Sequence, residues 1–315
     1  MRDIHQLETV VLGNCKQYIS THTDDAENPL LLMLHGGPGT AQIGFIRHFT
    51  QPLEKEFIIV NWDQRGSGKS YKFKPDASTM TVEQFISDAI ELIKLLLKTH
   101  NKEKIYLVGH SWGTVLGLAL TQKIPELIHA YVAVSQVVNM EMGEQISYQF
   151  ALDKAIQKQN DKAITDLKRI GAPPYKTFKD TIKKGEWLTE LGGSTYEIDL
   201  KKVMQRASSL KEYNIWDWVY RFAKGVYFSV EHLEKELLAV KFDTEIHAIK
   251  VPIWFFIGDS DYQVPFALAE KYFTQLSANQ KIKVNFSRCG HMIPFEKPVE
   301  FCDEIIKIKQ AIQGK

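Results

Sequence analysis

The feature that most restricts the fold is a serine between glycines at the junction of two periodic segments. The sequence GHSWG occupies residues 109–113, directly after the apolar run 105–108 and before the helix-compatible run 114–121. A strand that turns sharply into a helix at such a sequence lifts the serine hydroxyl off the sheet edge, and the glycines avoid clashes in the tight turn. Glycine and serine are common in loops, but this position between strand and helix predicts that Ser111 is a catalytic nucleophile.

Short apolar segments alternate with amphipathic segments along most of the chain. Strands are expected at residues 30–34, 57–60, 105–108, 130–134, 253–257 and 282–286. Helices are expected at residues 82–93, 266–276 and 299–312, the first with Thr81 as its N-cap. Continuously apolar strands are typical of a parallel sheet covered on both faces, so the alternation predicts a doubly wound, mostly parallel α/β sheet. The first thirty residues, with a turn at Gly13 and Asn14, are expected to form an antiparallel hairpin that leads into it.

The alternation breaks between residues 137 and 249. This stretch is helical in pattern, shows no clear buried strand and contains three of the six tryptophans. We therefore expect a core domain of residues 1–136 and 250–315, and a helical cap (lid) domain of residues 137–249 on the side of the sheet where ligands bind. Most of its aromatic side chains are expected to pack the cap against the sheet, whereas Trp216 and Tyr227 are expected to line a substrate pocket.

A serine nucleophile needs a base to take its proton and an acid to orient that base. His291 follows the last expected strand and precedes a helix, a position that distinguishes it among the ten histidines. Two aspartates follow the strand before it. Asp261 can point back at a histidine from one turn beyond the strand end, whereas Asp259 is better placed to bind loop amides. The favoured triad is therefore Ser111, Asp261 and His291, with Asp259 as the alternative acid.

Backbone amides for an oxyanion hole are expected at two places. The sequence HGGPG, residues 35–39, follows an apolar strand, and its glycines leave N–H groups outside regular secondary structure. The amides of Gly37 and of Trp112, the residue after the serine, are expected to converge on one spot. His110, next to the serine, is expected to point away from the reaction.

The sequence DQRGSGKS, residues 63–70, contains the Gly-Lys-Ser of a phosphate-binding loop. That loop needs a glycine five residues before Gly68, where this chain has Asp63, and no helix-forming run follows Ser70. We therefore reject nucleotide binding. Asp63 and Arg65 are instead expected to form a buried pair that supports the site.

Composition excludes several other functions. A balance of 39 Lys+Arg against 38 Asp+Glu gives a formal net charge of +1, so no basic face for nucleic acid or an anionic membrane is implied. The sparse cysteines Cys15, Cys289 and Cys302 suggest a reducing compartment, and no cluster of ligand residues has metal spacing, so neither metal nor cofactor is expected. The N-terminus lacks the apolar core of a signal peptide, and no apolar run is long enough to span a membrane. We expect a cytoplasmic enzyme with a small-molecule or short-peptide substrate, and the oligomeric state stays open.

With these motifs the chain resembles the prolyl iminopeptidase family of α/β-hydrolases (peptidase S33 type). Residues 35–39, 63–68 and 109–113 are similar to that family's three N-terminal motifs, and the resemblance covers about residues 30–135 and 250–312. It implies an α/β-hydrolase fold with a helical cap and a triad in the chain order serine, aspartate, histidine. It also implies metal-free release of an N-terminal residue, often proline, from short peptides.

The cap departs from the family pattern at one place. Prolyl iminopeptidases of the bacterial type carry a glutamate just before a Tyr-Phe pair, and it holds the ammonium group of the substrate. Here Tyr227 and Phe228 follow residues 221–226, which include no acid.

Other cap acids are the substitutes for that glutamate. Glu144 is the first candidate, because it follows soon after an expected strand, and Asp217 and Glu231 are the others. The alternative is that these acids lie on solvated helix faces. An aminopeptidase and an esterase or amidase for small apolar acyl groups therefore both stay open, as does a non-catalytic ligand-binding protein on the same fold.

Overall fold

The central sheet has eight strands in the order β1-β2-β4-β3-β5-β6-β8-β10. The computed structural model describes residues 3–41, 43–73, 75–198, 212–214, 217 and 223–314. The strands are β1 (Ile4–Leu12), β2 (Cys15–Thr23), β3 (Leu30–Leu34), β4 (Ile58–Asp63), β5 (Ile105–His110), β6 (Ile128–Val134), β8 (Ile253–Gly258) and β10 (Lys281–Phe286). Strand β2 is antiparallel to β1 and β4, and every pair from β4 to β10 is parallel. The predicted doubly wound α/β sheet and its N-terminal hairpin are confirmed.

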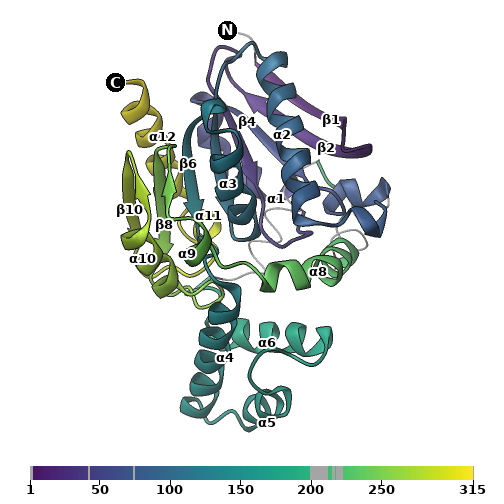
Figure 1. Cartoon of the computed structure of the whole chain (residues 1–315), viewed down its shortest axis with the longest axis vertical. Coiled ribbons are helices and arrows are strands. Elements are labelled where there is room, and N and C mark those ends of the chain that lie inside the picture. The colour runs from purple at the N-terminus through teal and green to yellow at the C-terminus, as the bar shows by residue number, and fades with distance from the viewer. Residues whose placement is uncertain are drawn as a thin grey trace.

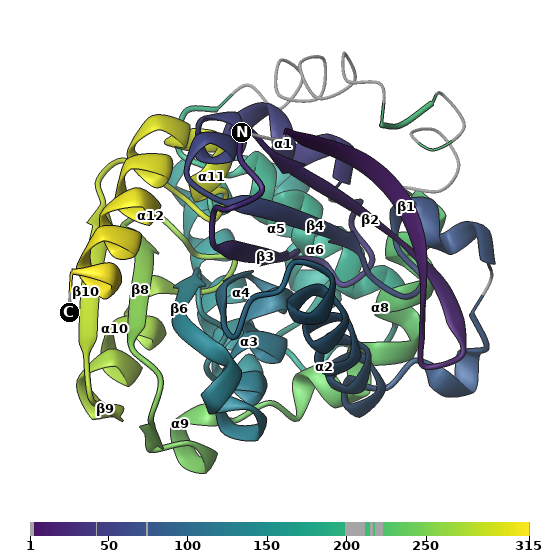
Figure 2. The ribbon, with the colours of Figure 1, turned by 90° about the horizontal axis from the view of Figure 1, so that it is seen from above.

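Helices cover both faces of this sheet, as Figures 1 and 2 show. One face packs against α2 (Val82–Thr99), α3 (Trp112–Lys123) and α10 (Phe266–Gln275). The other packs against α1 (Ile43–Thr50), α11 (Ile293–Glu296) and α12 (Pro298–Gln313). Strand β3 illustrates the two-sided burial, because Leu30, Leu32 and Leu34 join the first core while Leu31 and Met33 join the second. Burial on both faces explains why five consecutive apolar residues indicate a strand of a parallel sheet.

Short elements complete the core. Short 3₁₀ helices span Gln51–Lys55, Gly68–Phe73, Ala77–Thr79 and Pro125–Leu127, and a small parallel sheet joins β7 (Ala248–Ile249) to β9 (Ser277–Ala278). Helix α2 begins where the sequence predicts, since the hydroxyl of Thr81 accepts a hydrogen bond from the Gln84 amide at 3.2 Å.

The segment between β6 and β8 is helical. It contains α4 (Met140–Gln157), α5 (Asp161–Ile170), α6 (Phe178–Glu190), α8 (Ala223–Leu238) and α9 (Phe242–Glu245). Helices α4 to α6 extend from one end of the sheet in Figure 1 and share a small core of their own, whereas α8 and α9 contribute Leu233, Leu237 and Phe242 to the main core. Within the described ranges, no helix has both the length and the apolar character needed to cross a membrane. The division into a core and a cap of residues 137–249 stays a prediction.

Candidate active site

Ser111 lies at the tight turn between β5 and α3. Its backbone has φ +54° and ψ −121°, an uncommon conformation for a residue with a side chain. A Cβ atom at Gly113 would collide with the carbonyl oxygen of Leu34, and one at Gly109 would lie 2.6 Å from the carbonyl oxygen of Gly113. The two glycines therefore allow α3 to start against β3 and β5, and this close approach presents the Ser111 side chain at the sheet edge.

Asp261 and His291 meet at the same edge. Asp261 follows β8 and His291 follows β10, and these strands are parallel neighbours, so the loops after them lie side by side. His291 Nδ1 lies 2.9 Å from Asp261 Oδ2, and both side chains are almost fully buried. The other carboxylate oxygen, Oδ1, accepts hydrogen bonds from the amides of Gln263 (3.0 Å) and Val264 (2.8 Å). The carboxylate is thus held rigidly against the imidazole.

Asp259 has a different set of partners. Its carboxylate accepts hydrogen bonds from the amides of Arg288 at 3.0 Å and Cys289 at 3.3 Å. Although partial burial opposes the effect, these amide hydrogen bonds lower the pKa of Asp259 below its usual value. Asp259 therefore joins the loop after β8 to the loop after β10, while Asp261 contacts the histidine.

Ser111 and His291 line one cavity of about 320 Å³. Gly36, Gly37 and His110 form part of its wall, and the remaining lining is mainly apolar: Ala41, Phe45, Val226, Val230, Met292 and Phe295. None of the hydrogen bonds among the described residues involves the Ser111 hydroxyl. Catalytic hydrogen bonds are often absent or long until a substrate binds.

The glycine-rich loop after β3 lies next to Ser111. A Cβ atom at Gly36 would lie 3.2 Å from Cβ of Ser111, so the loop backbone passes directly over the serine. Gly37 has φ +114°, a conformation that favours glycine, and it lies in the cavity wall. Trp112 is the first residue of α3, and its indole donates a hydrogen bond to Gln64 Oε1 at 2.9 Å. Gly37 and Ser111 therefore line the same cavity, and α3 begins at the residue after Ser111.

His110 does not point away from the site, and that expectation is wrong. Its ring lies 4.9 Å from the His291 ring, and its Nε2 lies 2.9 Å from the His291 carbonyl oxygen. Desolvation, followed by the nearby His291, lowers the pKa of His110 to about 3, so its ring is neutral at physiological pH. Because the carbonyl only accepts, Nε2 carries the proton and donates it, which fixes the backbone of the histidine loop.

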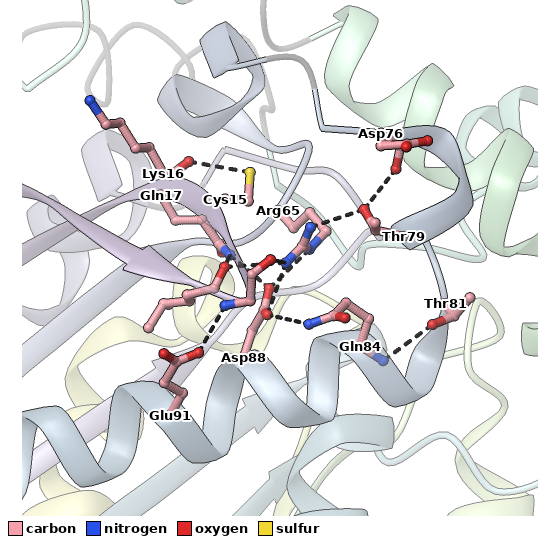
Figure 3. A network of polar contacts seen from close by, with 12 residues as sticks. Cys15, Lys16, Gln17, Arg65, Asp76, Thr79, Thr81, Gln84, Asp88 and Glu91 are labelled. Carbon is pink, nitrogen blue, oxygen red and sulfur yellow. Dashed lines mark hydrogen bonds and ion pairs between the residues drawn. The ribbon is translucent and has the colours of Figure 1, made fainter.

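Asp63 and Arg65 do not pair, contrary to expectation. Figure 3 shows Arg65 directed at Asp88 on α2, with Nε–Oδ2 and Nη2–Oδ1 distances of 3.0 Å. Asp63 instead accepts hydrogen bonds from the Tyr213 hydroxyl and from the amide of Ile43, at the start of α1. Since α1 and α2 cover opposite faces of the sheet, the two side chains leave the chain on opposite sides.

The Arg65–Asp88 pair is part of a larger buried network. Gln17 and Gln84 donate hydrogen bonds to Asp88 at 2.6 and 2.8 Å, and Arg65 Nη2 also donates to the carbonyl of Gly13 at 3.1 Å (Figure 3). Both charged side chains are at most 1% exposed. This network joins α2 and the β1–β2 turn to the loop after β4.

Glu144 lies in a second cavity of about 260 Å³, which adjoins the first because Gly37 and Val230 line both. Its Oε2 pairs with Lys184 Nζ and accepts a hydrogen bond from the Tyr175 hydroxyl at 3.0 Å. Burial, followed by the charge of Glu144, raises the pKa of Tyr175, so the phenol stays protonated. Glu144 is 14% exposed and thus does not lie on a solvated helix face.

The other expected cap residues lie elsewhere. Tyr227 is 52% exposed, packs edge-on against Phe178, and lines a different surface hollow. Trp216 lies outside the described residues. Asp217 pairs with Lys69 at 2.9 Å, and Glu231 is exposed.

Glu234 was missed by the sequence analysis. It lines the same cavity as Glu144 and accepts a hydrogen bond from the Thr181 hydroxyl at 2.8 Å. Its position on α8 carries no signal in the sequence, since only the packing of α8 against α6 brings it there.

Comparisons with known proteins agree with this geometry. The family model of the alpha/beta hydrolase fold matches residues 29–298. The chain is 36% identical to a probable aminopeptidase, YbaC, of Bacillus subtilis, over 96% of each chain. It is 22% identical to a proline iminopeptidase of Heyndrickxia coagulans, over 86% of this chain and 87% of the relative. Among solved structures, a proline iminopeptidase-related protein of Thermus thermophilus superposes with a TM-score of 0.65 at 20% identity and covers 99% of each chain.

Proposed function

Because the chain belongs to the α/β-hydrolase family and is a hydrolase of that fold, we propose that it is a serine aminopeptidase that releases the N-terminal residue of short peptides. The observation that carries the proposal is the 2.9 Å contact between His291 and Asp261, behind a cavity that Ser111 and His291 both line. The relatives named as aminopeptidase and proline iminopeptidase support the choice of substrate class.

In the proposed reaction, His291 removes the proton of Ser111 as the hydroxyl attacks the scissile carbonyl. Asp261 occupies Nδ1 of the imidazole, so Nε2 is the nitrogen that serves as the base. The amides of Gly37 and Trp112 donate to the oxyanion that forms. His291 then protonates the leaving amine, and a water molecule hydrolyses the acyl-enzyme by the same route.

We propose that Glu144 binds the ammonium group of the substrate. A buried ammonium needs an anionic partner, and Glu144 lies in the cavity that adjoins the Ser111 cavity. Its contacts with Lys184 and Tyr175 both use Oε2, so among the described residues Oε1 is the oxygen that can accept from a ligand. In this proposal residues 137–249 act as the cap, the protein works in the cytoplasm without a metal in its reaction, and it binds no nucleic acid.

One observation favours a second activity. Lys184 already balances the charge of Glu144, and most of the lining of both cavities is apolar. A neutral acyl group would fit such a site without an unpaired charge, as in an esterase or amidase.

A panel of aminoacyl-naphthylamides and short-chain p-nitrophenyl esters separates the two activities. We expect faster turnover of the aminoacyl substrates with a free N-terminus than of their N-acetylated forms. Equal rates for free and N-acetylated substrates, together with faster ester hydrolysis, would replace the aminopeptidase with the esterase or amidase. Ser111→Ala is the control, and it should be inactive on every substrate of the panel.

A further inference from the structure

A cluster of metal-ligand side chains lies at the other edge of the sheet, outside the Ser111 cavity. His5 on β1 and His22 on β2 are directly opposite each other in the antiparallel ladder. Their Nδ1 atoms are 3.2 Å apart, and Glu54 Oε2, from the 3₁₀ helix Gln51–Lys55, lies 3.9 Å from His5 Nδ1. The ligand atoms of all three residues lie within 4.8 Å of one another. We propose that His5, His22 and Glu54 bind a divalent transition-metal ion of the Zn²⁺ type.

The ligand set and its spacing fit such an ion. Two histidines and a carboxylate are a common donor set for zinc, and imidazole favours zinc and its neighbours over Mg²⁺ or Ca²⁺. With Zn–N bonds of about 2.0–2.1 Å and tetrahedral angles, two ligand nitrogens are about 3.3 Å apart. The 3.2 Å between the two Nδ1 atoms is close to this spacing, and Glu54 Oε2, at 3.9 Å from His5 Nδ1, has to move closer to complete it.

His22 is a buried histidine whose polar contact lies within the cluster. It is 4% exposed, and its Nδ1 lies 3.2 Å from His5 Nδ1. Its Nε2 has no hydrogen-bond partner, so among the described residues the contact with His5 is the hydrogen bond that this ring makes, and a metal ion bound at Nδ1 would replace it.

Arg47 is a cation next to the cluster. Its Nε donates to Glu54 Oε1 at 2.8 Å, and its Nη1 pairs with Glu212 at 2.8 Å. Its Nη2 lies 3.4 Å from Glu54 Oε2 and 3.5 Å from His5 Nδ1, so binding of an ion requires the planar guanidinium to turn away from these two atoms. A carboxylate that binds a metal through one oxygen and accepts an outer hydrogen bond through the other is a usual arrangement.

The site would stabilise the edge of the sheet and take no part in the reaction. His5 is 42% exposed, so an ion can enter from solvent. The carbonyl of Glu54 accepts a hydrogen bond from the Asp24 amide at 2.8 Å, which already fixes the 3₁₀ helix to the end of β2. A metal would add a link to β1, the edge strand, which has only one neighbour to hold it.

Calorimetric titration of the chelator-treated, full-length protein with ZnCl₂ tests the proposal. We expect one equivalent of Zn²⁺ to bind and to raise the thermal midpoint, and we expect no such rise with MgCl₂. His5→Ala, which changes an exposed side chain, should weaken Zn²⁺ binding by roughly 10–100-fold or more and remove the rise in the midpoint. Glu54→Gln should also weaken it, and His247→Ala, an exposed histidine between α9 and β7, is the control that should not.

Failure of the wild-type protein to bind Zn²⁺, or equal binding by the His5→Ala and His247→Ala variants, would overturn the proposal. Hydrolysis should be unchanged after treatment with EDTA, because no ligand of this site lines the Ser111 cavity. Loss of turnover in EDTA, restored by Zn²⁺, would contradict both the structural role of this site and the serine mechanism.

Discussion

The loops at the carboxyl edge of the sheet and the helices α4 to α6 build their polar contacts in different ways. Asp261 and His291 come from loops that directly follow neighbouring parallel strands, so the strand order alone brings them together. Glu144 comes from α4, Tyr175 from the loop between α5 and α6, and Lys184 from α6, and these segments meet around a separate small core. Under the proposed function, loops of the sheet supply the catalytic residues and the helices α4 to α6 supply a residue for specificity, so the two can be altered separately.

The strongest test of the contacts at the carboxyl edge of the sheet compares Asp261 with Asp259, two aspartates of the loop after β8. Asp261→Asn should lower kcat by about 10⁴-fold, because the imidazole loses the charge that orients it and stabilises its protonated form. Asp259→Asn, the matched control, weakens only the loop-to-loop hydrogen bonds and should retain most activity. Steady-state kinetics on both variants measures this, and a reversed order of effects would make Asp259 the acid.

The buried Arg65–Asp88 pair should contribute to the free energy of unfolding. Asp88→Leu leaves the buried Arg65 guanidinium without its counter-ion and should lower the free energy of unfolding by about 3–5 kcal/mol. Glu83→Gln, on the same helix as Asp88, breaks an exposed pair with Lys123 of α3 and should cost about 0–1 kcal/mol. Urea denaturation of the two variants should separate them clearly, and equal midpoints would show that the network in Figure 3 is not a principal support.

A substitution of Glu144 on α4 should have a smaller effect on the kinetics, and this effect should depend on the class of substrate. Glu144→Gln should raise KM for aminoacyl substrates by about 10–100-fold, the loss of a charge-assisted hydrogen bond of about 1.5–3 kcal/mol, and should spare neutral esters. Glu234→Gln, on the same cavity wall, is the matched control. Because Glu144→Gln also leaves Lys184 unpaired, the thermal midpoint of this variant should be measured in addition to its kinetics. Equal kinetics of mutant and parent on both substrate classes would remove Glu144 from the site.

The features of the molecule that depend on local sequence patterns could be predicted from the sequence. Ser111 and Asp261 each follow a continuously apolar strand, and His291 follows β10, in which polar and apolar residues alternate, so the order of strands in a parallel sheet predicts that all three lie at one edge. Contacts between segments that lie far apart in the sequence could not be predicted from it. Arg65 pairs with Asp88 on α2 and not with Asp63, because the side chains of Arg65 and Asp63 lie on opposite faces of the sheet. His110 lies next to His291 because the loop after β10 passes the end of β5.

The candidate metal site was missed for the same reason. His5, His22 and Glu54 lack the short spacing of metal motifs, and strand pairing with the packing of a 3₁₀ helix brings them together. Sequence spacing detects ligands on one helix or loop, and it does not detect ligands gathered across a sheet.

The most direct test of the central claim is covalent labelling with a fluorophosphonate probe, followed by mapping of the modified peptide by mass spectrometry. The account predicts one label, on Ser111, which fails to form in Ser111→Ala while the folded state of that variant is unchanged by circular dichroism. A label on another residue, or undiminished labelling of Ser111→Ala, would contradict the assignment of the nucleophile, and the absence of any label on the wild-type protein would contradict the serine mechanism itself.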